Sequence, residues 1–163
     1  MKHTKETIDK YLGYLLAAIM GLMVIDVVWG VMVRYLLNSP SSFTDELARY
    51  FLIWVGLLGA ALAAGKQMHL AIDILPNKLE PEGQKRLNIL IEIIIFLFAL
   101  SILVIGGVRL VYITLTLGQA SPSLGIPLGY VYIVLPLSGL LIMYYSVINI
   151  ILALKKVPEN SPA

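Results

Sequence analysis

The sequence predicts an all-α membrane protein with four transmembrane helices, because it is too apolar for a soluble domain and its basic residues gather between apolar stretches. Hydrophobic residues make up 59% of the 163 residues, charged residues make up 13%, and the mean hydropathy is +0.87. A soluble domain needs more polar surface than this. A bilayer core of about 30 Å takes roughly 20 helical residues, so residues 1–163 form one four-helix transmembrane domain with no room for a soluble catalytic domain.

Four apolar stretches predict helices at about residues 11–37, 43–64, 85–117 and 130–154. The first is too long for the apolar core of a signal peptide. Turn-forming residues at 38–42, followed by the acidic pair Asp45 and Glu46, mark the start of the second helix. Pro136 falls inside the fourth helix, where a neighbouring helix can satisfy the carbonyl group that proline leaves without a donor.

The second helix ends in a run of small residues, and a short charged segment follows it. Small side chains let another helix approach closely in a bilayer, so we expect this part of the helix to contact protein. Segment 66–84 mixes charged and apolar residues at helical spacing, which predicts a short interfacial helix containing Lys66, His69 and Asp73. The spacing of His69 and Asp73 suits a local hydrogen bond. The small residues are Gly56, Gly59, Ala60, Ala61, Ala63, Ala64 and Gly65.

The positions of lysine and arginine predict the orientation, because these residues resist translocation. Nine of the twelve basic residues lie before the first helix, between the second and third, or after the fourth, and the other two connections have none. We therefore expect both termini in the cytoplasm and the connections at 38–42 and 118–129 in the periplasm. The charges flank apolar segments and form no basic face, so the net charge of +2 does not indicate nucleic-acid binding.

Charged residues inside the spans are costly and are therefore candidates for function. Asp45 and Glu46 precede Arg49 by four and three residues, so both reach it on one helical face. Arg34 lies near the same hairpin at the end of the first helix. We predict that Arg34, Asp45, Glu46 and Arg49 form a charge cluster that clamps the first two helices and supports assembly.

Asp26 lies near the middle of the first helix, where a carboxylate needs a partner or a proton. Arg109 in the third helix lies at a comparable depth at about 1.5 Å per residue, so we predict that the two form a midplane pair. A single buried acid is also how a minimal antiporter would couple to protons. An autonomous proton-coupled antiporter that uses Asp26 is therefore an alternative function.

The sequence offers no set of catalytic or metal-binding residues. It contains no cysteine, and its two histidines, His3 and His69, lie outside the spans. A haem within the helices would need axial imidazoles there, and a histidine-based metal site needs more ligands. No glycine-rich phosphate loop follows a strand, and no nucleophile has a plausible base. We expect a chain that is not an enzyme and holds no metal or cofactor.

Five sequence motifs are distributed along most of the chain. They are Ser39-Pro40, the run Thr44 to Tyr50 (TDELARY), Trp54 with Gly56 and Gly59, the run Lys66 to Asp73 (KQMHLAID), and the run Ser121 to Tyr130 (SPSLGIPLGY). These motifs, the chain length and the four-helix plan together resemble the small membrane subunit (DctQ-like) of tripartite ATP-independent periplasmic (TRAP) transporters.

The resemblance implies a scaffold subunit of a sodium-driven importer of organic acids in a bacterial inner membrane. Its partners would be a large membrane subunit, which carries the substrate and sodium sites, and a periplasmic substrate-binding protein. Sodium is then expected in the large subunit and not in this chain. The chain also lacks the pair of interrupted helices that forms a transport site in many transporters. A structural four-helix subunit of some other complex is a third possibility.

The two connections predicted to face the periplasm are candidates for docking the binding protein. They present Ser41, Ser121, Pro122 and Ser123 and have no formal charge, so we expect a weak and transient interface. Short loops of proline, serine and glycine also act as simple turns, and that interpretation stays open.

Overall fold

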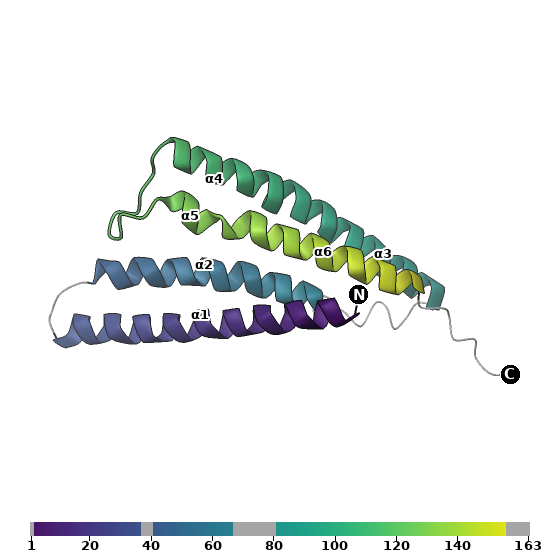
Figure 1. Cartoon of the computed structure of the whole chain (residues 1–163), viewed down its shortest axis with the longest axis horizontal. Helices are drawn as coiled ribbons and strands as arrows, with labels where there is room; N and C mark the ends of the chain where they lie inside the picture. Colours follow the sequence, from purple (N-terminus) through teal and green to yellow (C-terminus); the bar gives the residue numbers. More distant parts are fainter. Residues whose placement is uncertain (1, 37–40, 67–80, 156–163) are drawn as a thin grey trace.

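The computed structural model describes residues 2–36, 41–66 and 81–155, which are mostly helical and include no β-strand (Figure 1). The elements are α1 (Lys2–Leu36), α2 (Ser42–Gly65), α3 (Pro81–Phe98), the π-helical segment η3 (Ala99–Gly106), α4 (Gly107–Thr116), α5 (Leu128–Tyr132) and α6 (Val134–Lys155). Four stretches of the described residues are long and apolar enough to cross a membrane: Lys5–Leu36, Ser42–Gly65, Glu82–Thr116 and Leu128–Leu154. The predicted all-α fold with four transmembrane helices is confirmed.

Two helices begin earlier than the apolar pattern predicts. Helix α1 starts at Lys2 instead of residue 11, because the polar residues before the apolar stretch include no glycine or proline to stop the helix. Its 35 residues extend about 52 Å at 1.5 Å per residue, so α1 is longer than a bilayer core. Helix α3 starts at Pro81 instead of residue 85, since proline needs no N–H partner in a first turn. The other bounds lie within two residues of the predicted ones.

The helices pack in the order α1, α2, α6 and then the third span, as Figure 1 shows. Helix α2 packs against α1 on one side and α6 on the other, and α6 packs against α3 and η3. Helix α1 begins and α6 ends at one end of the molecule, which we call the terminal end (Figure 1). The opposite end bears Ser41 and residues 117–127, and we call it the loop end.

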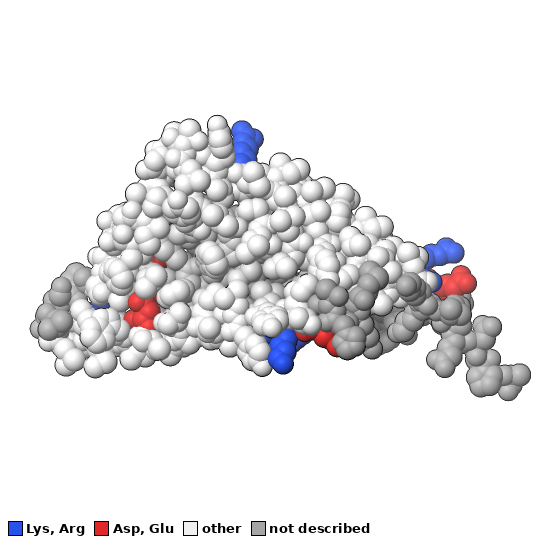
Figure 2. All heavy atoms as spheres, in the orientation of Figure 1, with Lys and Arg blue, Asp and Glu red and all other residues white. Residues whose placement is uncertain are grey.

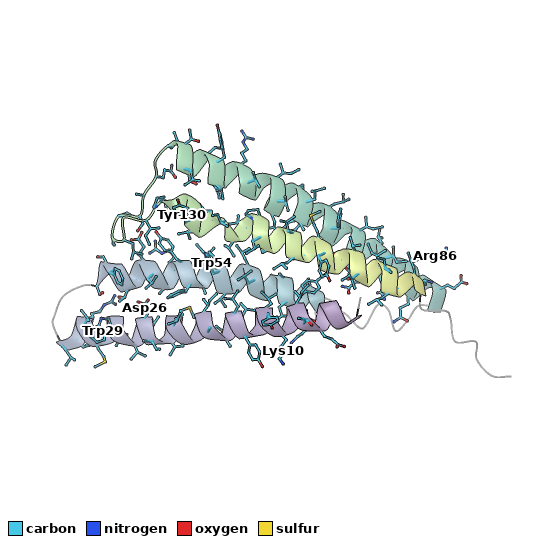
Figure 3. All side chains as sticks on the ribbon, viewed as in Figure 1. Lys10, Asp26, Trp29, Trp54, Arg86 and Tyr130 are labelled. Carbon is cyan, nitrogen blue, oxygen red and sulfur yellow. The ribbon has the colours of Figure 1, made fainter. Side chains whose placement is uncertain are left out.

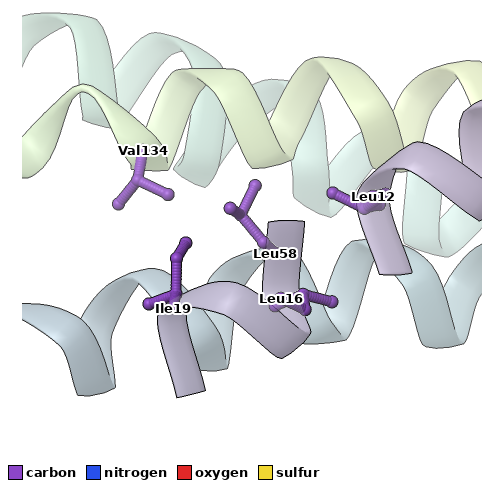
Figure 4. Close-up of a cluster of buried hydrophobic side chains, with 5 residues drawn as sticks. All are labelled: Leu12, Leu16, Ile19, Leu58 and Val134. Carbon is purple, nitrogen blue, oxygen red and sulfur yellow. The ribbon is translucent and has the colours of Figure 1, made fainter. Parts of the chain in front are cut away.

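Two small apolar clusters hold the helices together. The first joins α1, α2 and α6 through Leu12, Leu16, Ile19, Leu58 and Val134 (Figure 4). The second joins α2, η3 and α6 through Ala61, Ala64, Ala99, Leu103 and Ile142. Part of the small-residue run of α2 therefore faces α6, and a Cβ on Gly65 would lie 2.7 Å from the Tyr145 ring. Small side chains there allow the close approach that packing in a bilayer requires.

The fourth span is broken at Ile133, between α5 and α6. Pro136 has no N–H to donate to the carbonyl group four residues before it, and its ring crowds that carbonyl. Beside the break, Trp54 of α2 donates its indole N–H to the Val131 carbonyl oxygen at 3.1 Å. A membrane span with an internal proline needs hydrogen bonds from neighbouring groups to its freed backbone. Trp54 supplies one such bond from α2.

The third span contains the π-helical segment η3 where it packs against α6. A Cβ on Gly107 would lie 2.9 Å from Leu135 Cβ and 2.9 Å from Pro136 Cδ, and one on Gly139 would lie 2.8 Å from Leu103 Cβ. These two glycines let the third and fourth spans touch almost backbone to backbone. The π-helical segment was not predicted, because the apolar pattern alone does not distinguish it from an α-helix.

Large apolar side chains cover most of the surface between the two ends. Ile25, for example, is 67% exposed and Ile105 is 60% exposed. Figure 2 shows a surface made mostly of uncharged residues, with the charged groups in a few small patches. Such a surface is unfavourable in water and suits the hydrocarbon core of a bilayer or another membrane protein. The chain is a multi-pass membrane protein.

Candidate functional site

The connection between the third and fourth spans is an ordered loop at the loop end. Gly118 and Gly125 adopt positive φ angles of 61° and 67°, which glycine tolerates without strain. Backbone bonds join Ser121 N–H to the Ile126 carbonyl at 2.9 Å and Leu128 N–H to the Gln119 carbonyl at 2.9 Å. The Ser121 hydroxyl accepts from Leu124 N–H at 3.1 Å, and Ser121 is 3% exposed. Residues 118–127 therefore present a fixed surface, which we call the ordered loop.

Glu46 attaches the ordered loop to α2. One of its carboxylate oxygens accepts from Ser123 N–H at 2.9 Å, and the other accepts from the Tyr50 hydroxyl at 2.6 Å. Tyr50 lies one turn further along α2, so the helix itself places the hydroxyl beside the carboxylate. The predicted pairing of Glu46 with Arg49 does not occur, and the two carboxylate oxygens accept these other bonds instead. Pro122 and Ser123 are both exposed on the same loop.

Arg34 and Asp45 join the ends of α1 and α2. The Arg34 guanidinium donates to both carboxylate oxygens of Asp45, at 3.3 Å and 3.1 Å, and both side chains are 57% exposed. The structure thus brings together this half of the predicted charge cluster. At Ser41, which precedes α2 and is half-buried, the backbone carbonyl accepts from the Thr44 hydroxyl at 3.0 Å.

Arg49 stands apart from the cluster in which it was predicted. Its side chain is exposed and makes no hydrogen bond or ion pair with any residue that the structure describes. The neighbouring acids are engaged elsewhere, Asp45 by Arg34 and Glu46 by Tyr50 and Ser123. The expected cluster of four residues is therefore an Arg34–Asp45 pair, a Glu46 loop anchor and a free Arg49.

Asp26 and Arg109 are not brought together. Asp26 is 9% exposed and lies between α1 and α2, whereas the labelled Trp29 on the same helix is 61% exposed (Figure 3). Arg109 is exposed on α4, and Figure 1 shows α1 and α4 at opposite edges of the molecule. The predicted midplane pair is not formed, because depth along a helix does not determine which face a residue occupies. Among the described residues, Asp26 Oδ2 has no hydrogen-bond partner.

A polar cluster near the terminal end connects all four spans. Asn149 of α6 is 1% exposed, and its amide donates to Glu92 Oε1 of α3 at 2.9 Å and to the Ala64 carbonyl of α2 at 3.3 Å. Its carbonyl oxygen accepts from Lys5 Nζ of α1 at 3.3 Å. We call this group, with the neighbouring bond from the Tyr145 hydroxyl to Asp9 at 2.5 Å, the Asn149 cluster.

Sequence reasoning missed the Asn149 cluster. Asn149 was not among its candidates, although an asparagine within an apolar span is a signal for an interhelical hydrogen bond. Of the predicted interfacial segment, Lys66 is exposed at the end of α2. His69 and Asp73 lie outside the described residues. Those described residues contain no group of three or more histidine or acidic side chains placed to hold a metal ion.

These features define a multi-pass helical membrane protein with a fixed loop at one end and a polar interhelical cluster near the other. A sequence model of the family described as "Tripartite ATP-independent periplasmic transporters, DctQ component" matches residues 12–156. The chain belongs to this family, and it is a small permease subunit of a TRAP transporter. The resemblance noted in the sequence motifs is thereby confirmed.

Three relatives illustrate the match. A protein of Haemophilus influenzae that is named as a TRAP transporter small permease protein is 34% identical over 142 residues, covering 87% of this chain and 86% of the relative. The sialic acid TRAP transporter small permease protein SiaQ of Vibrio cholerae is 25% identical over 140 residues, covering 82% and 81%. The sialic acid TRAP transporter permease protein SiaT of Haemophilus influenzae is 26% identical over 148 residues, which cover 88% of this chain but 22% of SiaT.

Proposed function

We propose that this chain is the scaffold subunit of a sodium-coupled importer of organic acids in a bacterial inner membrane. The observation that carries the proposal is the match to SiaT, since nearly all of this chain corresponds to less than a quarter of that single permease protein. A separate small chain of the same family would need a large membrane subunit to supply the rest. Sialic acid, named for SiaT and SiaQ, is an organic acid, which supports that substrate class.

The scaffold role is further supported by what the described residues do. Asn149 joins α6 to the other three spans through three hydrogen bonds. The buried hydroxyls of Thr44, Thr114 and Ser138 bond carbonyl oxygens three or four residues earlier in the chain. A transport site in a membrane protein instead places unpaired polar groups and interrupted helix ends around a cavity at midplane. The break at Ile133 does not fit that description, because Trp54 bonds the backbone beside it.

The autonomous antiporter is less favoured than the scaffold. It would rest on Asp26, whose side chain is enclosed between α1 and α2 and is 9% exposed. Family membership also assigns the chain to a multi-subunit transport system. The antiporter interpretation predicts proton movement by this chain alone, which the scaffold interpretation excludes.

We further propose that the ordered loop faces the periplasm and helps dock the substrate-binding protein. This orientation rests on the positions of the basic residues, and docking is supported by the rigidity that the glycine turns, the backbone bonds and Glu46 give the loop. A preorganised surface loses little conformational entropy on binding, so even a small uncharged patch can support a transient contact.

A binding-protein titration tests the docking proposal. In proteoliposomes that contain both membrane subunits, Ser123→Arg should raise the binding-protein concentration for half-maximal uptake about three- to tenfold, a loss of roughly 0.7–1.4 kcal/mol. Leu154→Arg adds the same charge at the terminal end, where Leu154 is 59% exposed, and should leave that concentration unchanged. If the two changes raise that concentration equally, or if neither raises it, docking must rest on the large subunit.

A further inference from the structure

One face of α2 turns away from both of its neighbouring helices. Four exposed residues spaced three or four positions apart form it, and we call them the outward stripe of α2: Arg49, Leu52, Gly56 and Ala60. The buried residues of the same helix lie on its other faces, among them Thr44, Leu58, Ala61 and Ala64. The outward stripe therefore contacts either lipid or another protein.

Arg49 places a charge within this stripe and inside the apolar span. It lies about 10 Å from the first residue of α2, at 1.5 Å per residue. The two acids nearest to it on the helix are already engaged, so no described residue neutralises it. A charge at such a depth is expensive in lipid and normally pairs with an opposite charge. The structure thus shows a cation that has no partner among the described residues.

Arg109 offers a comparison at similar depth, about 10 Å from the last residue of α4. It too is exposed and unpaired among the described residues, but its surroundings differ. Its neighbours on the helix surface are the bulky residues Ile105, Tyr112 and Ile113, which are 60%, 69% and 39% exposed, with a single small residue, Gly106, among them. Such a surface suits lipid, and Tyr112 lies one turn nearer the loop end, where an arginine can extend to the headgroups.

The surroundings of Arg49 suit a protein instead. A Cβ on Gly56 would meet nothing within 4 Å, and the same holds for Gly59 beside it, so the chain itself leaves this surface open. A second helix can approach α2 closely there and can place a carboxylate beside the guanidinium. A lipid phosphate reaches Arg49 only from the membrane surface and makes no use of the open space at Gly56, two turns deeper.

We propose that Arg49 pairs with a carboxylate of the large membrane subunit, and that the outward stripe of α2 is part of the interface between the two subunits. The inference rests on the proposed function, which supplies the large subunit as the partner. Charge complementarity indicates a carboxylate as the partner group, since an arginine in an apolar span needs a negative counter-ion. Planar guanidinium and carboxylate groups pair through two parallel hydrogen bonds, which also fixes their orientation.

Assembly of the complete transporter tests the pair. The small subunit and the large subunit are co-expressed and purified in detergent through a tag on the small subunit, and the retained large subunit is measured. Arg49→Ala should lower retention at least about tenfold, because it leaves the partner carboxylate unpaired in the interface. Arg49→Lys keeps the charge and should recover part of the retention. Arg109→Ala, the matched control, should retain the large subunit as the unchanged chain does.

A photo-crosslinking experiment tests directly whether the outward stripe lies against the large subunit, and it does not depend on how well Arg49 variants fold. A photoreactive phenylalanine analogue at Leu52, one turn from Arg49, should form a crosslink to the large subunit. The same analogue at Tyr112, one turn from Arg109, should react with lipid only.

The outcomes separate this inference from the proposed function. Normal retention with Arg49→Ala together with lipid-only products from Leu52 would overturn the inference and leave the scaffold role intact. If the unchanged chain fails to retain any large subunit, the proposed function fails and the inference fails with it. A crosslink from Leu52 with retention lost in Arg49→Ala supports both.

Discussion

Glu46 illustrates how one carboxylate decides the arrangement of a loop that lies 77 residues away along the sequence. It accepts one hydrogen bond from its own helix, through Tyr50, and one from the backbone of the ordered loop, through Ser123. The helical neighbour Tyr50 orients the carboxylate so that the other oxygen faces the loop. A hydrogen bond to an ionised group contributes more than a neutral one, about 1.5–3 kcal/mol. The ordered loop therefore depends on a side chain of a different span.

The first prediction is that Glu46→Ala releases the ordered loop. The Ser123 amide loses its acceptor, so its hydrogen exchange should become roughly tenfold faster or more, in keeping with a loss of at least about 1.5 kcal/mol. Exchange is measured on the protein in detergent or nanodiscs. Glu82→Ala is the control, because Glu82 makes an exposed contact with Arg86 at 3.9 Å, far from the loop. Unchanged exchange at Ser123 in Glu46→Ala would remove Glu46 as the anchor.

At the residue scale, sequence reasoning identified which charges matter but not all of their partners. The Arg34–Asp45 contact follows from two helices that are separated by few residues in the sequence, and the sequence is sufficient to predict it. The Ser123–Glu46 bond involves a backbone group brought in by tertiary packing, which helical spacing does not reveal. Asp26 and Arg109 fail as a pair because similar depth leaves the direction around each helix undetermined.

At the scale of the elements, close contact between the third and fourth spans depends on glycine. Gly106 and Gly107 are adjacent, yet only Gly107 faces α6. A Cβ there would lie 2.9 Å from the ring of Pro136 and 3.1 Å from its backbone nitrogen, and neither group can move aside easily. A Cβ on Gly106 would have one neighbour, Ser101 O, at 3.7 Å, which is ordinary contact.

The second prediction compares these two glycines. Gly107→Ala should destabilise the protein by about 1–3 kcal/mol, because it forces the two spans apart. Gly106→Ala should be neutral or stabilising by up to about 1 kcal/mol, since alanine favours the helix without a clash. Unfolding in detergent, followed by circular dichroism, measures both. Equal destabilisation by the two changes would show that the spans do not meet at Gly107.

The third prediction concerns α6, whose Asn149 bonds to the other three spans. Asn149→Ala removes the donor to Glu92 and leaves a charged acceptor without its partner, at a cost of about 1.5–3 kcal/mol in the free energy of unfolding. Ser146→Ala is the control on the same helix, because Ser146 is 1% exposed and its hydroxyl has no partner among the described residues. Removing an unpaired hydroxyl should cost at most about 0.5 kcal/mol. If the two variants unfold alike, the Asn149 cluster does not stabilise the spans.

The positions of the elements were largely predictable, and their irregularities were not. Long apolar stretches determine where helices lie. Pro136 was expected inside one continuous fourth helix, and the break at Ile133 was not predicted. The π-helical segment depends on how the third span packs against α6, so the hydrophobic pattern does not reveal it. The early start of α1 was missed because polar residues outside a bilayer can continue a helix that apolar residues began.

For the molecule as a whole, orientation follows from charge. The start of α1, the end of α2, the start of α3 and the end of α6 lie at the terminal end (Figure 1), and most basic residues occur at or beside these helix ends in the sequence. The fourth prediction is that this end faces the cytoplasm. The chain has no cysteine, so single replacements can be labelled without background. An impermeant maleimide should label Ser41→Cys and Ser123→Cys in intact cells, and Asn77→Cys only after permeabilisation. The reverse pattern would invert the topology.

Beyond the contact between the first two helices, the sequence alone did not predict which helices are neighbours. The order α1, α2, α6 and third span emerges from contacts such as Trp54 with Val131, between residues far apart in the chain. The family, in contrast, was predictable, because its motifs lie in continuous segments that can be read directly. Substrate and coupling ion depend on the proposed partners.

The central claim is that this chain is a transporter subunit that does not transport by itself, and uptake by proteoliposomes tests it most directly. Vesicles with this chain alone should accumulate no organic acid and should move no protons. Vesicles that also contain the large subunit should accumulate substrate when the binding protein and an inward sodium gradient are supplied, and Asp26→Asn should keep substantial uptake. Proton-coupled flux through the chain alone, abolished by Asp26→Asn, would contradict the account.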